Sequence, residues 1–221
     1  MTAHRKFEVQ LENLRNEAGI AARFLYAEIA MQHAVSKSPK LLSRLNQTPT
    51  FWIACGAALQ SAAYMSLGRI FDLNSKYNVN ALLDAAEHDL SDFQRPALEA
   101  RKRQGSASTP QWLAQYLDDA YYPKASDIAR LRKKVADFRL IYERAVKPAR
   151  NKYLAHREKQ DRAEVQALFS GGTLKYLWRL TTFLVQLNTV LWELLHNGRK
   201  PAFRRARYSV RSIYDSKTQG T

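Results

Sequence analysis

The sequence predicts an all-α protein, an up-and-down helical bundle of four to five main helices with extra short helices and a basic C-terminal tail. Apolar residues recur at steps of three and four along several long segments, and no segment shows the alternation typical of a strand. A hydrophobic fraction of 46% in 221 residues is enough for one sizeable core. We therefore expect one bundle domain over residues 1–198 and a basic extension over residues 199–221.

The first two long helices are expected over residues 5–35 and about 49–72, with a break at Ser36–Pro39 between them. Apolar residues at helical spacing line one face of the first: Phe7, Leu11, Leu14, Ala18, Ala22, Leu25 and Ile29. Thr48 followed by Pro49 is a typical helix start. The second helix is rich in glycine, alanine and serine, which permits close approach of a neighbouring helix.

The middle of the chain is less regular. Residues 74–108 predict short helices and a solvated basic stretch at Arg101–Ser106. Thr109-Pro110 predicts the start of another short helix, which ends near Pro123.

The next long helix is expected from Ser126, a plausible N-cap with Asp127 behind it. Its apolar residues form an uninterrupted stripe at steps of three and four: Ile128, Leu131, Val135, Phe138, Tyr142, Ala145 and Ala149. Continuing the count leads to Lys152 and His156, so His156 lies on the extension of the buried face. Pro148 is expected to kink or split this helix just before Arg150.

The last long helix covers about residues 173–197. Leucines recur along it at helical spacing: Leu177, Leu180, Leu184, Leu187, Leu191 and Leu194. Trp178, Phe183, Trp192 and Leu195 widen its apolar surface, which favours a core position or a dimer surface for this helix. Gly198 is a good C-cap, and Pro201 prevents the helix from resuming.

The net charge of +15 and the pI near 10 favour a polyanionic partner. From Arg199 to Thr221 there are seven basic residues and one acidic residue, a net charge of +6. Tyr208 and Tyr214 lie among these charges and offer faces on which bases stack. We expect the tail arginines to contact phosphates: Arg204, Arg205, Arg207 and Arg211. The alternative is a tail that only aids solubility or weak non-specific binding.

Several functional classes are disfavoured by the sequence. A lone cysteine, Cys55, fits a reducing compartment, and the N-terminus has no apolar run typical of a secretion signal. Charged residues within 174–195 exclude an ordinary membrane span. The other four histidines lack the neighbours of a zinc site, and there is no glycine-rich phosphate loop. We expect a cytoplasmic protein without a metal or cofactor.

The string Arg150-Asn151-Lys152-Tyr153-Leu154-Ala155-His156 carries the most chemical information. Only Arg150 has a histidine five to seven residues downstream. RNA supplies its own nucleophile, the 2′-hydroxyl. Its cleavage therefore needs a group that titrates near neutral pH, which histidine provides, and a permanent cation for the phosphate, which arginine provides. On one ideal helix, residues six apart point about 120° away from each other. A kink, a broad groove or a second subunit is then needed to bring Arg150 and His156 together.

This string resembles the signature of HEPN-domain proteins, many of which are metal-independent ribonucleases, and in particular the AbiU2-like branch associated with abortive infection and toxin–antitoxin systems. The string Arg69-Ile70-Phe71-Asp72 loosely resembles the same branch. Here we expect Asp72 only to end its helix. The resemblance implies a two-fold homodimer with paired motifs in one cleft, and a possible cognate antitoxin protein. Position 158 is glutamate, where some HEPN toxins carry a tyrosine that a partner antitoxin modifies. The sequence therefore lacks the residue on which that particular pairing depends.

The resemblance implies roles for three catalytic residues. His156 acts as general base or general acid, Arg150 stabilises the scissile phosphate, and Asn151 orients the histidine or the phosphate. The products would be a 2′,3′-cyclic phosphate and a 5′-hydroxyl. Lys152 and Arg157 are expected to hold RNA, or else to be ordinary solvated charges. The alternatives to a ribonuclease toxin or antiphage effector are a non-catalytic helical protein that binds nucleic acid or a partner, and a purely structural dimeric bundle.

Overall fold

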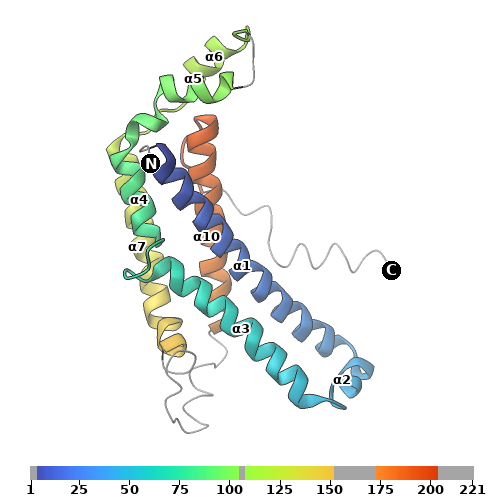
Figure 1. Ribbon diagram of the computed structural model, residues 1–221. Coiled ribbons are helices and arrows are strands. Elements are labelled where there is room, and N and C mark those ends of the chain that lie inside the picture. The colour runs from blue at the N-terminus through green and yellow to red at the C-terminus, as the bar shows by residue number, and fades with distance from the viewer. Residues whose placement is uncertain (1–3, 105–107, 152–172, 204–221) are drawn as a thin grey trace.

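The computed structural model describes residues 4–104, 108–151 and 173–203, and all regular structure within these ranges is helical (Figure 1). The predicted all-α bundle is therefore confirmed. The elements are α1 His4–Lys37, α2 Pro39–Leu45, α3 Pro49–Phe71, α4 Val79–His88, the 3₁₀ helix η1 Leu90–Phe93, α5 Arg95–Arg103, α6 Leu113–Asp119, α7 Ala125–Ala145, α8 Lys147–Ala149 and α10 Thr173–Asn197. In these ranges no helix is long and apolar enough to cross a membrane.

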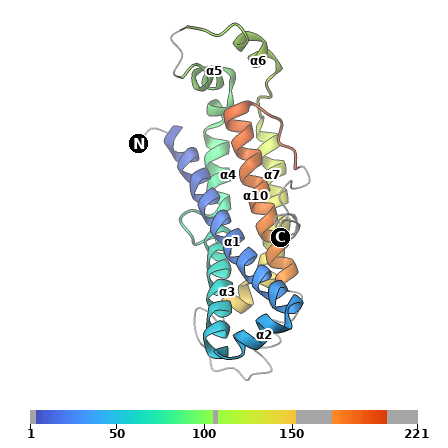
Figure 2. The same ribbon diagram turned by 90° about the vertical axis from the view of Figure 1, so that its right-hand side faces the viewer.

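Four long stretches of helix run up and down along one axis (Figures 1 and 2). α1 descends and α2 turns the chain, so that α3 and then α4 ascend beside it. α7 descends on the far side of α4, and α10 ascends between α1 and α7. One continuous core joins them, with Phe7, Leu67, Leu83, Ile128 and Leu184 among its fully buried side chains.

α5 and α6 form a cap at one end of the bundle (Figure 1). Their own small core consists of Leu98, Leu113 and Leu117. The expected helix start at Thr109-Pro110 is wrong: the Pro110 carbonyl accepts the Leu113 N–H in a turn at 3.1 Å, and α6 begins only at Leu113. A proline signal marks the turn here rather than the helix itself.

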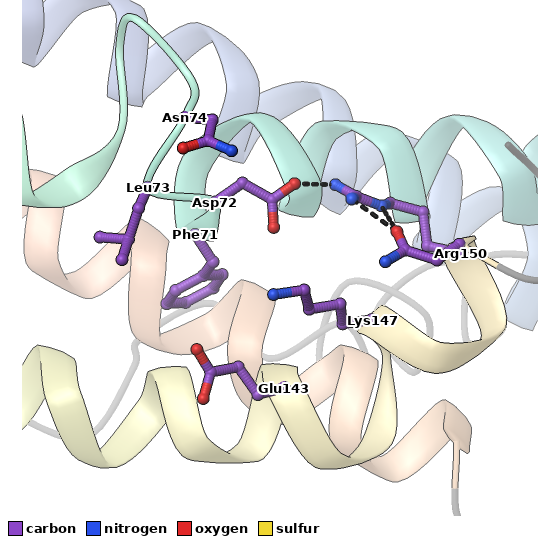
Figure 3. A pocket seen from close by; sticks show the side chains of 8 residues that line it. Phe71, Asp72, Leu73, Asn74, Glu143, Lys147 and Arg150 are labelled. Atoms are coloured by element: carbon purple, nitrogen blue, oxygen red, sulfur yellow. Dashed lines mark hydrogen bonds and ion pairs between the residues drawn. The ribbon is translucent and has the colours of Figure 1, made fainter.

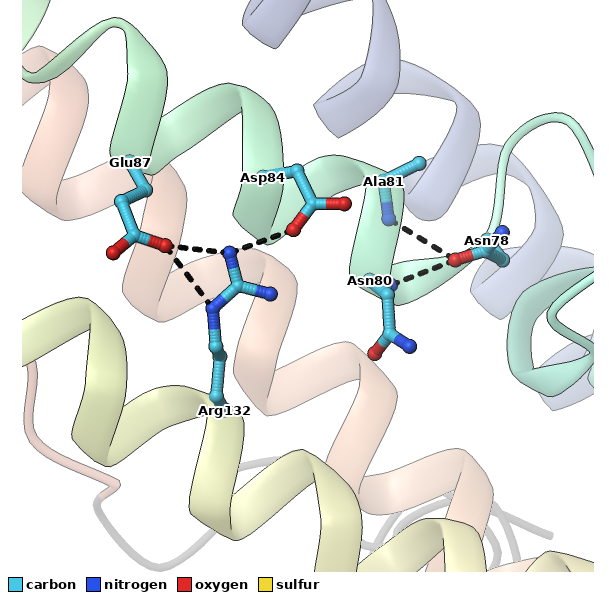
Figure 4. A network of polar contacts seen from close by, with 6 residues as sticks. All are labelled: Asn78, Asn80, Ala81, Asp84, Glu87 and Arg132. Atoms are coloured by element: carbon cyan, nitrogen blue, oxygen red, sulfur yellow. Dashed lines mark hydrogen bonds and ion pairs between the residues drawn. The ribbon is translucent and has the colours of Figure 1, made fainter.

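Polar groups attach α4 to α7 and fix where α4 begins (Figure 4). Asn78 caps α4, because its Oδ1 accepts the backbone N–H groups of Asn80 at 2.9 Å and Ala81 at 3.0 Å. From α7, Arg132 pairs with Asp84 and Glu87 of α4, at 2.7 Å in each case. The arginine thus ties two antiparallel helices together across their exposed edge.

α7 carries the predicted apolar stripe into the core. Ile128, Leu131, Val135 and Tyr142 are buried, and Phe138 is partly buried. The expected N-cap at Ser126 is wrong. Lys124 takes the N-cap position, and its N–H donates to Asp127 Oδ2 at 2.8 Å. An acidic residue at the third helical position therefore accepts the backbone N–H of the N-cap residue, as the third residue of a capping box does.

The interruption expected at Pro148 is confirmed. α7 ends at Ala145, and the short helix α8 carries the proline in its first turn. The Arg150 N–H resumes helical bonding to the Val146 carbonyl at 3.0 Å. Directly after this break, the Arg150 side chain reaches Asp72 at the C-terminal end of α3.

All six leucines predicted to line α10 are buried. The expected C-cap is confirmed at Gly198, which has a φ of 54°. A Cβ there would lie 2.8 Å from the Ala120 Cβ and 2.9 Å from the Leu98 side chain. Close packing against the α5–α6 cap and the left-handed backbone therefore both require glycine. Beyond it, Phe203 stacks on Phe183 of α10 with a centroid separation of 5.7 Å.

Candidate active site

Arg150 lies at the point where the end of α7–α8 meets the end of α3 (Figure 3). Its side chain reaches across to Asp72, which is 78 residues away in sequence, and Nη1 donates to Asp72 Oδ2 as an ion pair. Only 16% of the Arg150 side chain is exposed. The guanidinium is therefore held at the edge of the core and does not extend into solvent.

The adjacent residue, Asn151, holds the other side of the same guanidinium. Its Oδ1 accepts from Arg150 Nε at 3.0 Å and from Nη2 at 2.7 Å. With the Asp72 bond, these contacts use three of the five guanidinium N–H groups. A planar cation held on two edges has a defined orientation, as bidentate recognition of a phosphate requires.

Tyr142 holds the Asp72 carboxylate in place through a hydrogen bond. Its hydroxyl donates to Asp72 Oδ1 at 3.0 Å, and its fully buried ring stacks on Phe71 with a centroid distance of 5.3 Å. Burial, reinforced by the Asp72 carboxylate, raises the pKa of Tyr142 far above its ordinary value, while Arg150 acts in the opposite direction. Tyr142 therefore remains a protonated donor at neutral pH and fixes the carboxylate that in turn fixes Arg150.

Gly68 provides the space for the arginine. A Cβ at this position would lie 3.0 Å from Arg150 Cδ and closer still to Nη1, nearer than real side chains approach. The sequence predicted close approach of another helix to this part of α3. At Gly68 the close neighbour is instead the Arg150 side chain.

A pocket of about 330 Å³ opens beside this network. Its lining residues come from the end of α3, the turn after it and the α7–α8 segment: Phe71, Asp72, Leu73, Asn74, Glu143, Lys147, Arg150 and Asn151. Figure 3 shows the Lys147 ammonium reaching toward Asp72 from the opposite wall, with Glu143 beside it. The pocket thus presents two cations and two carboxylates, a mixture suited to a group that carries both negative charge and hydroxyls.

The structure brings together two of the residues predicted from the sequence, Arg150 and Asn151, and places both in the wall of this pocket. The third predicted catalytic residue, His156, lies outside the described residues. The same holds for the predicted RNA-binding residues Lys152, Arg157, Arg204, Arg205, Arg207 and Arg211.

Sequence reasoning missed the residues that hold Arg150. Asp72 was expected only to end its helix. It does so, since its N–H bonds the Gly68 carbonyl at 2.9 Å, but its carboxylate also binds Arg150. Tyr142 was assigned only to the apolar stripe, although a tyrosine in such a stripe brings a hydroxyl that needs a buried partner. Glu143 and Lys147, four residues apart just before Arg150, were a further signal.

The sequence profile of the AbiU2 family, HEPN_AbiU2, matches residues 5–215. No curated protein and no solved structure matches the chain. The profile match covers the whole bundle, including both the Asp72 and the Arg150 segments, and most of the C-terminal extension. The chain belongs to the abortive-infection-related AbiU2 family of HEPN domains.

Proposed function

We propose that the protein is a metal-independent endoribonuclease that acts as a toxin or antiphage effector in the cytoplasm. The observation that carries the proposal is the fixed guanidinium of Arg150 in the wall of a pocket, immediately before the segment that bears His156. A cation oriented before substrate binds is the arrangement that stabilises charge on a phosphate as the charge develops.

In the proposed reaction His156 accepts the proton of an RNA 2′-hydroxyl, and the 2′-oxygen attacks the adjacent phosphorus. The bond from phosphorus to the 5′-oxygen then breaks, and the leaving oxygen takes a proton from an acid, a role that the histidine of a second motif would fill. The products are a 2′,3′-cyclic phosphate and a 5′-hydroxyl. Arg150 binds the phosphate oxygens, Asn151 helps to orient the arginine or the histidine, and Asp72 and Tyr142 act as positioning residues.

RNA is the proposed substrate because the chain is strongly basic and RNA alone carries the required 2′-hydroxyl. Lys147 extends the cationic wall of the pocket within the described part of the chain. Lys152, Arg157 and the four tail arginines are proposed to hold the backbone. A homodimer and a cognate antitoxin protein are the proposed protein partners.

One observation favours a second candidate, a non-catalytic binding protein of the same fold. Arg150 is mostly buried, and its ion pair joins the end of α3 to the segment after α7, as a purely structural arginine would do. If this alternative is correct, substituting Arg150 destabilises the fold. RNA binding, where it occurs, is then carried by the basic surface and not by the pocket.

The experiment that separates the two candidates is cleavage of end-labelled RNA in EDTA by the wild type, Arg150→Ala and His156→Ala, with the product ends resolved. Two substitutions are matched controls. Arg69→Ala removes an arginine of α3 that bonds Glu17 at 2.8 Å on the outer surface, and His196→Ala removes a histidine from the other end of the bundle.

The ribonuclease proposal expects cyclic-phosphate ends from the wild type and both controls, and no cleavage by the two motif variants while their helical circular dichroism is retained. Cleavage by all five proteins alike, or by none of them, would contradict it. Binding that survives in Arg150→Ala without cleavage by any protein would support the non-catalytic alternative.

A further inference from the structure

The hydrophobic core does not reach the end of the hairpin that α1 and α3 form. Within residues 29–62, all of which the structure describes, Gly56 is the only buried residue. The last buried residue of α1 is Glu28, whose Oε1 accepts from Gln32 at 2.6 Å and from Gln60 at 3.2 Å. This polar cluster marks where the core ends. In both views α2 and the adjoining ends of α1 and α3 extend beyond the end of α10 (Figures 1 and 2).

This hairpin tip, residues 31–58, nevertheless carries many apolar side chains. Phe51 and Ile53, in the first turns of α3, are 60% and 73% exposed. No residue of α2 is buried, and its Leu42 is also exposed. The exposed residues of the next turns of α3 are small and apolar: Ala54, Ala57 and Ala58. A surface with this many uncovered apolar groups indicates that another body covers it.

The charge of the hairpin tip is of one sign. No aspartate or glutamate occurs between Glu28 and Asp72. Lys37, Lys40 and Arg44 lie in the tip, and all three are exposed. Basic residues beside exposed aromatic and aliphatic side chains are typical of segments that lie in the interface of an anionic membrane.

Trp52 adds a third feature. Its ring meets that of Phe51 edge to face, with centroids 5.1 Å apart, and it is only partly buried. Tryptophan favours the depth of the lipid headgroups, where its ring meets acyl chains and its N–H meets polar groups. A bilayer offers phosphates to the cations and acyl chains to the apolar residues at adjacent depths, which fits both properties of the tip.

We propose that the hairpin tip binds the surface of an anionic membrane. Phe51 and Ile53 enter the boundary of the acyl chains, and the basic residues of α2 and its flank bind lipid phosphates. The binding is peripheral and reversible, because side chains enter the membrane and no helix crosses it. The proposal does not depend on ribonuclease activity, since no tip residue lines the Asp72–Arg150 pocket.

The first test is co-sedimentation of the full chain with vesicles of phosphatidylcholine alone, or with an equal part of phosphatidylglycerol. We expect the wild type to bind the anionic vesicles. Phe51→Ser with Ile53→Ser keeps the net charge and should lower the partition coefficient at least about tenfold, because two side chains no longer enter the membrane. Trp112→Ser with Leu140→Ser is the matched control, since these residues are 53% and 50% exposed elsewhere, and should stay within about twofold of wild type.

A second pair of variants tests the charges. Lys37→Gln with Lys40→Gln should lower the partition coefficient about tenfold, because each cation near the surface attracts anionic lipid. Lys76→Gln with Lys133→Gln has the same net charge, and both lysines are exposed away from the tip. It should bind nearly as the wild type does. Circular dichroism establishes that all variants are folded.

A third measurement locates the contact. Brominated lipids should quench the tryptophan fluorescence of the wild type and of Trp112→Phe, and this quenching should fall in Trp52→Phe. A wild type that does not bind anionic vesicles overturns the proposal, as does equal binding by the tip variants and their controls. Self-association that depends on Phe51 and Ile53, without vesicle binding, would instead assign this surface to a second copy and also overturn it. None of these results bears on whether the chain cleaves RNA.

Discussion

The two ends of α7 use the same three side-chain types in different ways. At the N-terminal end the Asp127 carboxylate accepts the Tyr121 hydroxyl at 2.7 Å and pairs with Arg130. At the C-terminal end the Asp72 carboxylate accepts the Tyr142 hydroxyl at 3.0 Å and pairs with Arg150. Each network contains one aspartate, one tyrosine and one arginine.

The difference lies in which member is buried and what the network adjoins. The Asp127 side chain is 2% exposed while its arginine is 69% exposed, and the carboxylate also caps the backbone N–H of Lys124. In the other network the tyrosine is fully buried, the arginine is 16% exposed, and the carboxylate lines a pocket. The Asp127 network therefore stabilises the N-terminus of α7. The Asp72 network holds a cation beside a pocket, and so has the geometry of a binding or catalytic site.

The sharpest test of this comparison replaces the arginine of each network. We expect Arg150→Gln to lower the rate of RNA cleavage about 10²–10³-fold, because it removes the cation that stabilises charge on the phosphate. Arg130→Gln should leave the rate within about twofold, because its guanidinium lies in solvent. Initial rates on labelled RNA measure both effects, and similar rates for the two variants would contradict the assigned difference.

The next effect concerns stability at the other network. Asp127→Ala should lower the free energy of unfolding by about 2–3 kcal/mol, because it leaves the Lys124 N–H and the Tyr121 hydroxyl without their acceptor. RNA cleavage at a temperature where the variant is folded should be unchanged. Urea denaturation followed by circular dichroism gives the free energy, and a change below about 0.5 kcal/mol would show that the cap is dispensable.

A smaller change probes how precisely Arg150 must be held. Gly68→Ala places a methyl group against the arginine side chain, which must then shift. We expect roughly a tenfold loss of cleavage rate, because a misplaced catalytic group loses orientation. The helical circular dichroism should be retained, since the added methyl group meets a side chain and not the backbone. Gly19→Ala, where an added Cβ meets nothing within 4 Å, is the matched control and should behave as wild type. Equal rates for the two alanine variants would argue against a strict position for Arg150.

The smallest expected effect is a pH dependence at Asp127. Burial opposes its charge, yet the Lys124 N–H, the Tyr121 hydroxyl and Arg130 together hold the pKa of Asp127 below its ordinary value of 3.8. A carboxylate whose folded pKa is lowered stabilises the fold above the unfolded pKa and loses that contribution as pH falls through the folded pKa. Urea unfolding between pH 5 and pH 3 should therefore show a steeper loss for the wild type than for Asp127→Asn. Parallel curves would mean that the charge contributes nothing.

Local periodicity was enough to predict the helices and the faces that they bury. The stripe of α7, the leucines of α10 and the glycine that ends α10 were all correctly assigned, because a helix places residues three and four apart on one face whatever surrounds it. The start signals at Thr109-Pro110 and Ser126 were misassigned. Several residues near each helix start are able to bond the free N–H groups, and packing selects among them.

Within the candidate site, the sequence identified Arg150 and Asn151 because their residue types match a known motif. The partnership of Arg150 with Asp72, Tyr142 and Gly68 depended on how α3 and α7 lie against each other, and no local pattern encodes a contact across 78 residues. The same holds for α10, where periodicity marked four residues as apolar and only packing separated buried Phe183 and Leu195 from exposed Trp178 and Trp192. Hydrophobic spacing specifies which face of a helix is apolar. The tertiary arrangement decides how much of that apolar face is covered by other helices of the same chain.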